Sequence, residues 1–192
     1  MRAVITLLVL LLSMCGAQTE VHTENMVVEM RLTAVKNRLA ATETEVVNLE
    51  KEITEKPKVA FSGGLRLLQG YIQAGGTDLD LVFNKIYTNV GEAYSTRTGY
   101  FTAPVRGVYY FRFTVMDTPV NGWLKVTLNK NGYRLLSLSE EHTNGNMSYL
   151  SSGMALELEA GEQVVLRLPA GHKLIESPGN HNNFSGFLLF PL

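Results

Sequence analysis

The alternation of hydrophobic and polar positions divides the chain into a helical first part and a strand-rich second part. Between residues 18 and 56, apolar side chains recur at alternating steps of four and three, and glycine and aromatic residues are missing. From residue 57 onward the period shortens to two, in short segments separated by breaks rich in glycine and asparagine. These periods are those of an α-helix and of β-strands, so the pattern predicts a helix followed by a β domain.

The repeat of four and three predicts a coiled-coil oligomerisation segment over residues 18–56, sustained over about four heptads. An amphipathic helix packed on its own domain is the alternative, and the sustained repeat favours the coiled coil. Two polar residues, Asn25 and Thr42, interrupt the seam, and Pro57 ends the helix. The β-branched residues at both seam positions suit a trimer at least as well as a dimer. The seam residues are Val28, Leu32, Val35, Leu39, Val46, Leu49 and Ile53.

Seven segments of the second part read as strands, and no helical period appears among them. Turn sequences rich in glycine and asparagine separate the segments, for example at residues 74–78, 129–132 and 177–183. Many short strands with such turns are typical of an antiparallel sandwich or jelly roll, which we predict for residues 57–192. The predicted strands are 58–65, 81–87, 107–115, 123–129, 154–159, 163–168 and 184–190.

Two of the predicted strands are apolar on both faces. In the strand 107–115 a period of two places Tyr109, Phe111, Phe113 and Val115 on a core face and Val108 and Tyr110 on the other. In the last strand Phe184, Leu188 and Phe190 alternate with Phe187 and Leu189. A strand without a polar face indicates a second buried surface, so we expect a subunit interface. Its candidate residues are Val108, Tyr110, Phe187 and Leu189.

The same region carries a recognisable motif with the spacing F-x5-N-x4-Y-x6-F-x5-G-x-Y-x-F-x-F. Together with the segments that flank it, this pattern resembles the signature of the globular C1q domain, and the resemblance covers about residues 57–192. It implies a jelly roll of about ten strands that assembles as a compact trimer, the architecture shared with tumour necrosis factor (TNF) ligands. The motif residues are Phe83, Asn89, Tyr94, Phe101, Gly107, Tyr109, Phe111 and Phe113.

The N-terminal segment departs from the C1q pattern. A collagen stalk needs glycine at every third residue, whereas residues 18–56 contain none. A short coiled coil in that place is similar to cerebellin-like and C1q-like secreted proteins. Recruitment of complement proteases through a collagen stalk is therefore not expected.

The first 17 residues predict a secretory signal peptide. Arg2 precedes an apolar run from Ala3 to Leu12, and small residues follow at positions 15–17. The run is shorter than the roughly 20 residues that span a bilayer, so a retained anchor is the weaker interpretation. Cleavage after Ala17 would remove Cys15, the single cysteine of the chain, and would leave a secreted protein without disulfides.

Charge and histidine placement argue against two classes of function. The chain has 17 Lys and Arg against 18 Asp and Glu, so nucleic acid is a poor candidate partner. The four histidines are His22 in the helix and His142, His172 and His181 in predicted loops, without the spacing of a catalytic or metal site. We therefore predict a protein that is not an enzyme.

Two further kinds of site come from short motifs. Asp78 and Asp80 could offer oxygen ligands to calcium, as loops near the trimer apex do in some C1q-like proteins, but calcium usually takes six or more oxygens and a polar turn explains the pair equally well. Otherwise no cofactor is expected. The sequons at Asn146 and Asn183 could accept glycans in the secretory pathway, with Asn146 favoured because Asn183 abuts the last strand.

Taken with the resemblance, these features predict a secreted homotrimer, or a higher oligomer, that binds a cell-surface, microbial or receptor ligand without spanning a membrane. Multivalent recognition of microbial or altered-self surfaces in innate immunity is the preferred function. The alternatives are a cerebellin-like extracellular organiser, a TNF-type receptor ligand at cell contacts, and a structural matrix component.

Overall fold

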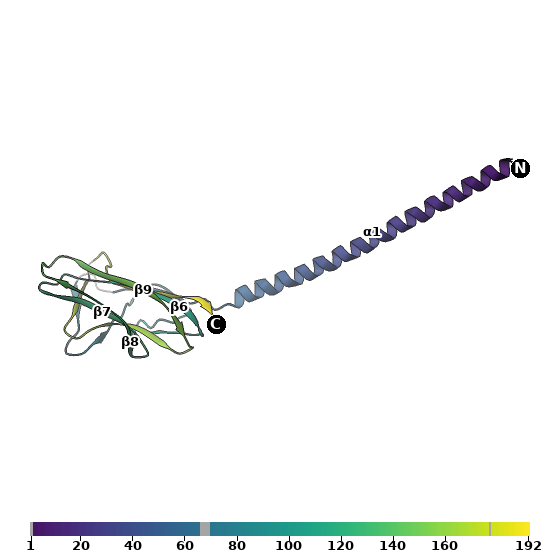
Figure 1. Cartoon of the computed structure of the whole chain (residues 1–192). Helices are drawn as coiled ribbons and strands as arrows, with labels where there is room; N and C mark the ends of the chain where they lie inside the picture. Colours follow the sequence, from purple (N-terminus) through teal and green to yellow (C-terminus); the bar gives the residue numbers. More distant parts are fainter. Residues whose placement is uncertain (1, 66–69, 177) are drawn as a thin grey trace. The chain divides into compact units, whose positions relative to one another are not determined.

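The computed structural model describes residues 2–65, 70–176 and 178–192, and it divides into two units, Met1–Lys56 and Pro57–Leu192. The first unit is one uninterrupted helix, α1 (Arg2–Glu55), drawn from purple to blue in Figure 1. Its last hydrogen bond joins the Lys56 N–H to the Glu52 carbonyl at 3.2 Å. The helix ends directly before Pro57, because proline lacks an N–H and disfavours helical geometry in the residue that precedes it.

The second unit, the head, is an all-β domain, as the sequence pattern predicts. Two of its strands, β3 and β5, are only two residues long, so the described residues form twelve strands where about ten were expected. They are β1 (Ala60–Gly64), β2 (Gly70–Gln73), β3 (Leu79–Asp80), β4 (Lys85–Val90), β5 (Phe101–Thr102), β6 (Gly107–Asp117), β7 (Gly122–Lys130), β8 (Tyr133–His142), β9 (Ser148–Leu158), β10 (Gln163–Leu168), β11 (Lys173–Glu176) and β12 (Asn183–Pro191).

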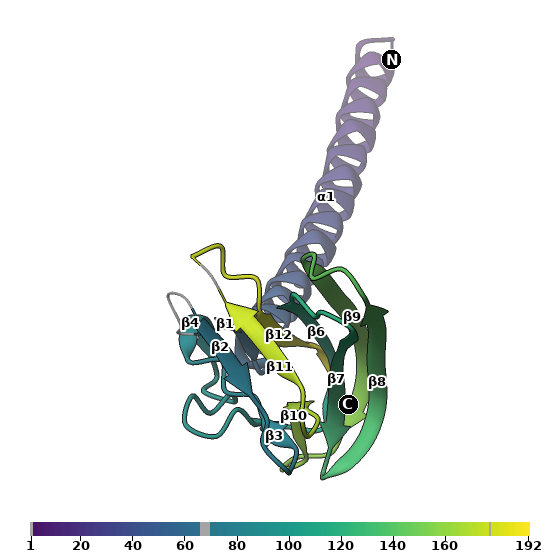
Figure 2. The same cartoon turned by 90° about the vertical axis from the view of Figure 1, so that its left-hand side faces the viewer.

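The strands form two facing antiparallel sheets. The first sheet has the order β4-β1-β12-β6-β9, and the second has the order β3-β10-β7-β8 with β5 beside β10. A short pair, β11-β2, lies toward the viewer in Figure 2. The first and last strands of the head, β1 and β12, are hydrogen-bonded neighbours. Each sheet buries its apolar face against the apolar face of the other sheet. The predicted jelly roll is therefore confirmed.

The core between the sheets is rich in aromatic rings from strands far apart in the sequence. Phe61 stacks on Tyr94 with ring centroids 4.6 Å apart, and Phe184 meets Phe61 edge-on at 4.9 Å. Tyr109, Phe111, Phe113 and Val115 of β6 are fully buried, which confirms the predicted inward face of that strand. The head contains no cysteine and therefore no disulfide. Buried aromatic side chains of this size contribute much of the stability of such a domain.

The hairpin between β7 and β8 shows how the sequence specifies one turn. Lys130 pairs with Tyr133, which leaves Asn131 and Gly132 as a two-residue loop. Both loop residues have positive φ, 50° and 83°. Asparagine and glycine tolerate this backbone geometry, which matches the twist of the flanking strands.

Several predicted strand boundaries were wrong. The strand expected over 81–87 begins only at Lys85, and β9 begins at Ser148 instead of residue 154. Five strands, β2, β3, β5, β8 and β11, were not predicted. Strand β8 is an exposed edge with adjacent Leu135 and Leu136, so it lacks a clear alternation. The predicted break 177–183 begins at Ser177, which lies outside the described residues.

Candidate functional site

The outer face of the first sheet carries a continuous row of apolar side chains. The pairing register aligns one residue from each of the five strands: Val90 of β4, Ala60 of β1, Phe187 of β12, Tyr110 of β6 and Ala155 of β9. Directly paired residues project on the same face with Cβ atoms about 5 Å apart, so the five side chains lie side by side. We call these five residues the apolar row.

A β-bulge in the last strand extends the apolar row. The register of β12 shifts between Leu188 and Phe190, so Phe190 pairs with Val108 instead of continuing the inward alternation. Phe190 therefore leaves the face of Phe184 and Leu188, where the sequence pattern placed it, and is 52% exposed. An extra residue in one strand turns every later side chain to the opposite face.

A polar row bounds the apolar row on one side. Two residues further along each strand, the register aligns Thr88, Ser62, Ser185, Arg112 and Gly153. Because the row next to the apolar row is polar, the exposed apolar surface ends there. An exposed apolar strip with a polar border is typical of an interaction surface.

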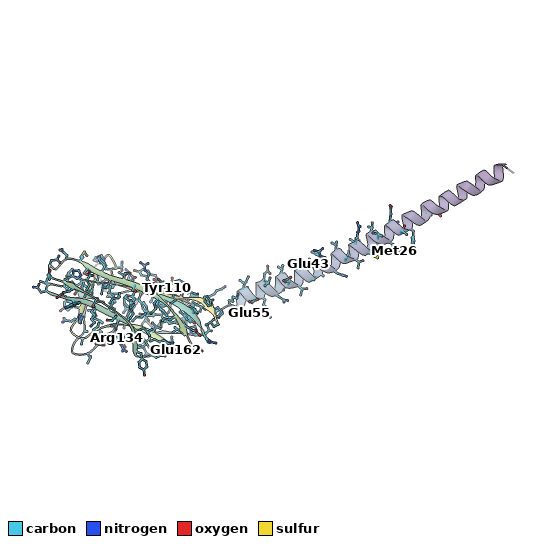
Figure 3. All side chains as sticks on the ribbon, in the orientation of Figure 1. Met26, Glu43, Glu55, Tyr110, Arg134 and Glu162 are labelled. Carbon is cyan, nitrogen blue, oxygen red and sulfur yellow. The ribbon has the colours of Figure 1, made fainter. Side chains whose placement is uncertain are left out.

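The Tyr110 ring lies over the neighbouring strand because that strand has glycine there. A Cβ atom at Gly153 would lie 2.3 Å from the Tyr110 Oη atom, so only glycine leaves room for the ring. On the other side, the Tyr110 and Phe187 ring centroids are 5.8 Å apart. Tyr110 of β6, labelled in Figure 3, thus lies against residues of both neighbouring strands, Phe187 of β12 and Gly153 of β9.

Candidates named from the C1q-like motif have structural roles. The Asn89 side chain donates from Nδ2 to the Tyr94 carbonyl at 2.9 Å and accepts from the Tyr94 N–H at 3.2 Å. The Tyr94 Oη atom accepts from the Phe83 N–H at 2.9 Å, and burial raises the pKa of Tyr94 to about 12. At Gly107 a Cβ would lie 2.7 Å from Leu188 Cδ1. Phe83, Phe101, Tyr109, Phe111 and Phe113 are buried in the core.

The two calcium candidates already have protein partners. Asp80 accepts hydrogen bonds from Arg167 Nε at 2.5 Å and from the Tyr100 hydroxyl at 2.7 Å, and Asp78 accepts from the Ala170 N–H at 3.0 Å. Burial and the bond to Asp80 raise the pKa of Tyr100. An arginine in direct contact with Asp80 supplies the charge that a cation would supply. Within the described residues, no group of three His, Cys, Asp or Glu side chains could hold a metal ion.

The histidines form no catalytic relay in the described structure. Ser148 Oγ lies 2.5 Å and Glu140 Oε2 lies 3.2 Å from the same atom, His142 Nε2. A hydrolytic triad needs the carboxylate on the opposite ring nitrogen, so this cluster cannot transfer a proton in that way. His172 donates from Nδ1 to the Ala170 carbonyl at 2.9 Å, and His181 Nδ1 contacts the Tyr149 hydroxyl.

The two sequons lie in different surroundings. Asn146 is exposed in the loop between β8 and β9, whereas Asn183 is the first residue of β12 and is paired with both Gly64 and Thr114. A glycan on Asn183 would stand on the outer face of the first sheet, which carries the apolar row. We therefore favour Asn146 as the acceptor.

We expect Asn146 to carry a glycan when the chain is expressed through the secretory pathway, and we expect its replacement to remove that glycan. Asn146→Gln should abolish the mass loss that endoglycosidase treatment produces, and Asn183→Gln should leave that loss unchanged. Intact mass spectrometry before and after treatment measures both. A glycan that disappears only with Asn183→Gln would contradict the assignment.

Helix α1 exposes its apolar seam. Each of the seven seam residues is between 45% and 64% exposed. Two ion pairs lie along the helix surface, Lys51–Glu55 and Glu52–Lys56, and each joins residues one helical turn apart. Exposed leucine, valine and isoleucine at coiled-coil spacing need a partner surface. Among the described residues, no helix is long and apolar enough to cross a membrane.

The head is a jelly roll in which its first and last strands, β1 and β12, pair within a five-stranded sheet that has an apolar outer face. This architecture is that of C1q and TNF-like domains. Comparisons with known proteins agree with this class. The sequence model of the C1q domain matches residues 60–189, so the chain belongs to the C1q domain family. Human complement C1q and tumor necrosis factor-related protein 9A is 32% identical over 137 residues, which cover 70% of this chain and 39% of the relative. The chain thus spans about two-fifths of that relative.

Solved structures give the same result. The globular domain of zebrafish complement 1qA protein is 26% identical, with a TM-score of 0.54 over 70% of this chain and 100% of that domain. Murine APRIL has a TM-score of 0.55 at 10% identity, covering 69% of this chain and 99% of its own. Eiger TNF from S. frugiperda has a TM-score of 0.54 at 13% identity, covering 71% and 96%. At such low identity, APRIL and Eiger support the shared fold alone.

Proposed function

We propose that the protein is a secreted, non-enzymatic binding protein in which three heads assemble through the apolar row and α1 forms a coiled coil. The apolar row is the observation that carries this proposal. A strip that crosses all five strands would be costly to leave in water, because each apolar Å² removed from water contributes about 25 cal/mol. A second copy of the same head is the simplest cover, since self-association needs no further partner.

The trimer would act through avidity. Three identical heads present three copies of every ligand-binding surface, and linked contacts that are individually weak can strengthen overall binding about 10²- to 10⁴-fold. Recognition of repeated ligands on microbial or altered-self surfaces uses this property directly. The likeness to the zebrafish complement domain supports this role.

An extracellular organiser or receptor ligand at cell contacts is the second candidate. The human relative carries tumor necrosis factor in its name, which supports this candidate. Binding of the secreted chain to fixed bacteria, measured by flow cytometry against binding to cultured animal cells, distinguishes the two roles. Saturable binding to bacteria is expected, and binding to animal cells alone would favour the second candidate.

The mass of the secreted full chain tests the assembly. Light scattering should give three times the mass of one chain, and mass spectrometry should give a chain that begins at Gln18. Leu39→Asp places a charge in the seam and should raise the concentration at which the trimer dissociates by about 100-fold or more, as for a lost interface hot spot. Met30→Asp is the matched control, because Met30 is 58% exposed on the opposite side of the helix.

A monomeric full chain would contradict the proposal. Equal effects of Leu39→Asp and Met30→Asp would contradict the coiled coil while leaving head assembly standing.

A further inference from the structure

A polar cavity of about 400 Å³ opens on the outer face of the second sheet. Lys125, Thr127 and Asn129 occupy alternate positions of β7 and therefore project on the same side of that sheet. Arg134 of β8 and Arg167 of β10 flank them, and the rim includes Asp78, Ala170 and His172. Figure 1 shows β7 and β8 in one layer and β6 and β9 in the other, so the cavity and the apolar row belong to opposite layers.

The strand register places the cations around a shared floor. Arg167 is paired directly with Thr127, and Arg134 is paired directly with Asn129. Strands are about 4.8 Å apart and residues rise about 3.4 Å along a strand, so the two arginines stand on either side of β7, about 12 Å from each other at the backbone. Lys125 lies on β7 two residues before Thr127. Arg134 is labelled in Figure 3. Three cationic side chains thus surround two neutral polar residues.

The floor is polar although it is buried. Thr127 is 4% exposed and Asn129 is 3% exposed. Asn129 donates from Nδ2 to Thr127 Oγ1 at 3.1 Å, which holds both side chains in place. Buried hydroxyl and amide groups carry a desolvation cost unless they find hydrogen-bond partners. A floor of this kind suits a polar ligand.

The three cations differ in how they are held. Arg167 is fixed by Asp80 and by the Tyr100 hydroxyl, which accepts from its Nη2 atom at 3.0 Å. Lys125 and Arg134 have no ion pair or side-chain hydrogen bond within the described part of the chain. One arginine is therefore rigid and two cations are available to a ligand. Arginine suits oxyanions because its planar donors match two oxygens at once.

The rim adds acceptors that an inorganic anion would not need. Asp78 uses one carboxylate oxygen for the Ala170 N–H. His172 donates its Nδ1–H to the Ala170 carbonyl, so Nε2 is the ring nitrogen that remains for another partner. Sugar hydroxyl groups both donate and accept, and they suit a rim of this mixed character.

We propose that this cavity binds a sugar that carries a sulfate or phosphate ester, with the ester among Lys125, Arg134 and Arg167 and the sugar hydroxyls toward Asp78 and His172. The cavity volume lies within the usual range of small-ligand sites, about 300–1,000 Å³. The proposal rests on the proposed function in that the head is taken to be a binding module. Because the cavity belongs to a single head, it does not depend on assembly.

Calorimetric titration of the full chain tests the site. The probes are N-acetylglucosamine 6-sulfate, glucose 6-phosphate, the two unmodified sugars, and inorganic sulfate and phosphate. At least one sugar ester should bind saturably below about 10 mM and at least 10-fold more tightly than its unmodified sugar or its inorganic ion. The two esters separate a sulfate ligand from a phosphate ligand.

Variants show whether the binding occurs in this cavity. Lys125→Met combined with Arg134→Met should weaken ester binding at least 10-fold, since the ester loses two charged hydrogen-bond donors. Arg97→Met is the matched control, because Arg97 is exposed and does not line the cavity. Absence of saturable binding, equal binding of esters and unmodified sugars or inorganic ions, or unchanged affinity of the double variant would each overturn the proposal.

Light scattering of the same samples separates this result from the assembly. A trimer that binds none of the esters would contradict the cavity proposal and leave the proposed assembly standing. A monomer that binds an ester would remove the proposed assembly alone.

Discussion

Phe187→Asp is expected to convert the head, expressed as a chain that begins at Lys56, from a trimer to a monomer. Phe187 is the central residue of the apolar row, with Ala60 on one side and Tyr110 on the other. Its ring is 43% exposed in the single chain, so the substitution leaves the core intact. A carboxylate buried at an apolar contact costs free energy that an exposed carboxylate does not.

The expected effect is large because a trimer contains the residue three times. A hot-spot residue contributes about 2 kcal/mol or more to an interface, so three copies contribute about 6 kcal/mol, a factor of about 10⁴ in the association constant. Light scattering over a range of concentrations measures the change. Circular dichroism of the same samples verifies that the variant is folded.

Tyr133→Asp is the matched control for assembly. Tyr133 is an aromatic residue that is 80% exposed, at the start of β8 in the second sheet. We expect this variant to remain trimeric. A trimeric Phe187→Asp head, or loss of the trimer in both variants, would mean that the heads do not assemble through the apolar row.

Phe184→Ala is expected to lower the free energy of unfolding of the head by about 4 kcal/mol, the usual cost of truncating a buried phenylalanine. Phe184 is fully buried three residues before Phe187, and its ring is in contact with four other rings. Their centroids lie at 4.9, 5.8, 6.1 and 6.2 Å, in Phe61, Phe83, Phe111 and Tyr94 respectively. Removing the ring leaves a cavity among these four.

Denaturant unfolding measures this loss most clearly in the Phe187→Asp background, where assembly adds no stability. Tyr133→Ala serves as the control, and it should change the free energy of unfolding by less than about 0.5 kcal/mol because Tyr133 is a surface residue. A loss below about 1 kcal/mol for Phe184→Ala would contradict the aromatic core.

The contrast between Phe184 and Phe187 shows which side-chain orientations the sequence pattern can predict. Strict alternation assigned the two residues to opposite faces, and the structure has Phe184 in the core and Phe187 outside. The same rule failed at Phe190, because the bulge at the end of β12 depends on pairing with β6, a strand about 80 residues earlier in the chain. No signal within the last strand specifies that bulge.

The C1q-like motif predicted the fold better than it predicted a site. Asn89, Tyr94 and Gly107 are tied to close contacts and hydrogen bonds that hold loops and strands together. These roles demand particular residues at fixed spacings, and for that reason they are visible in the sequence. Residues that would contact a ligand are under no such constraint from the fold.

The polar cavity was not predicted. Its lining residues come from β7, β8, β10 and three connecting segments, between positions 78 and 172. Along the chain they look like unrelated polar and charged positions, and β8 itself lacks a clear alternation. Only the pairing of Arg134 with Asn129 and of Arg167 with Thr127 brings them together.

The sequence by itself determined the helix that ends before Pro57, the β domain that follows it, the inward face of β6 and the Asn131-Gly132 turn. Each of these depends on local periodicity or on the backbone preference of one or two residues. The tertiary structure alone decided the register across the two sheets, and with it the apolar row, the position of Phe190 and the polar cavity. Register depends on contacts between strands distant in the chain, so local patterns cannot specify it.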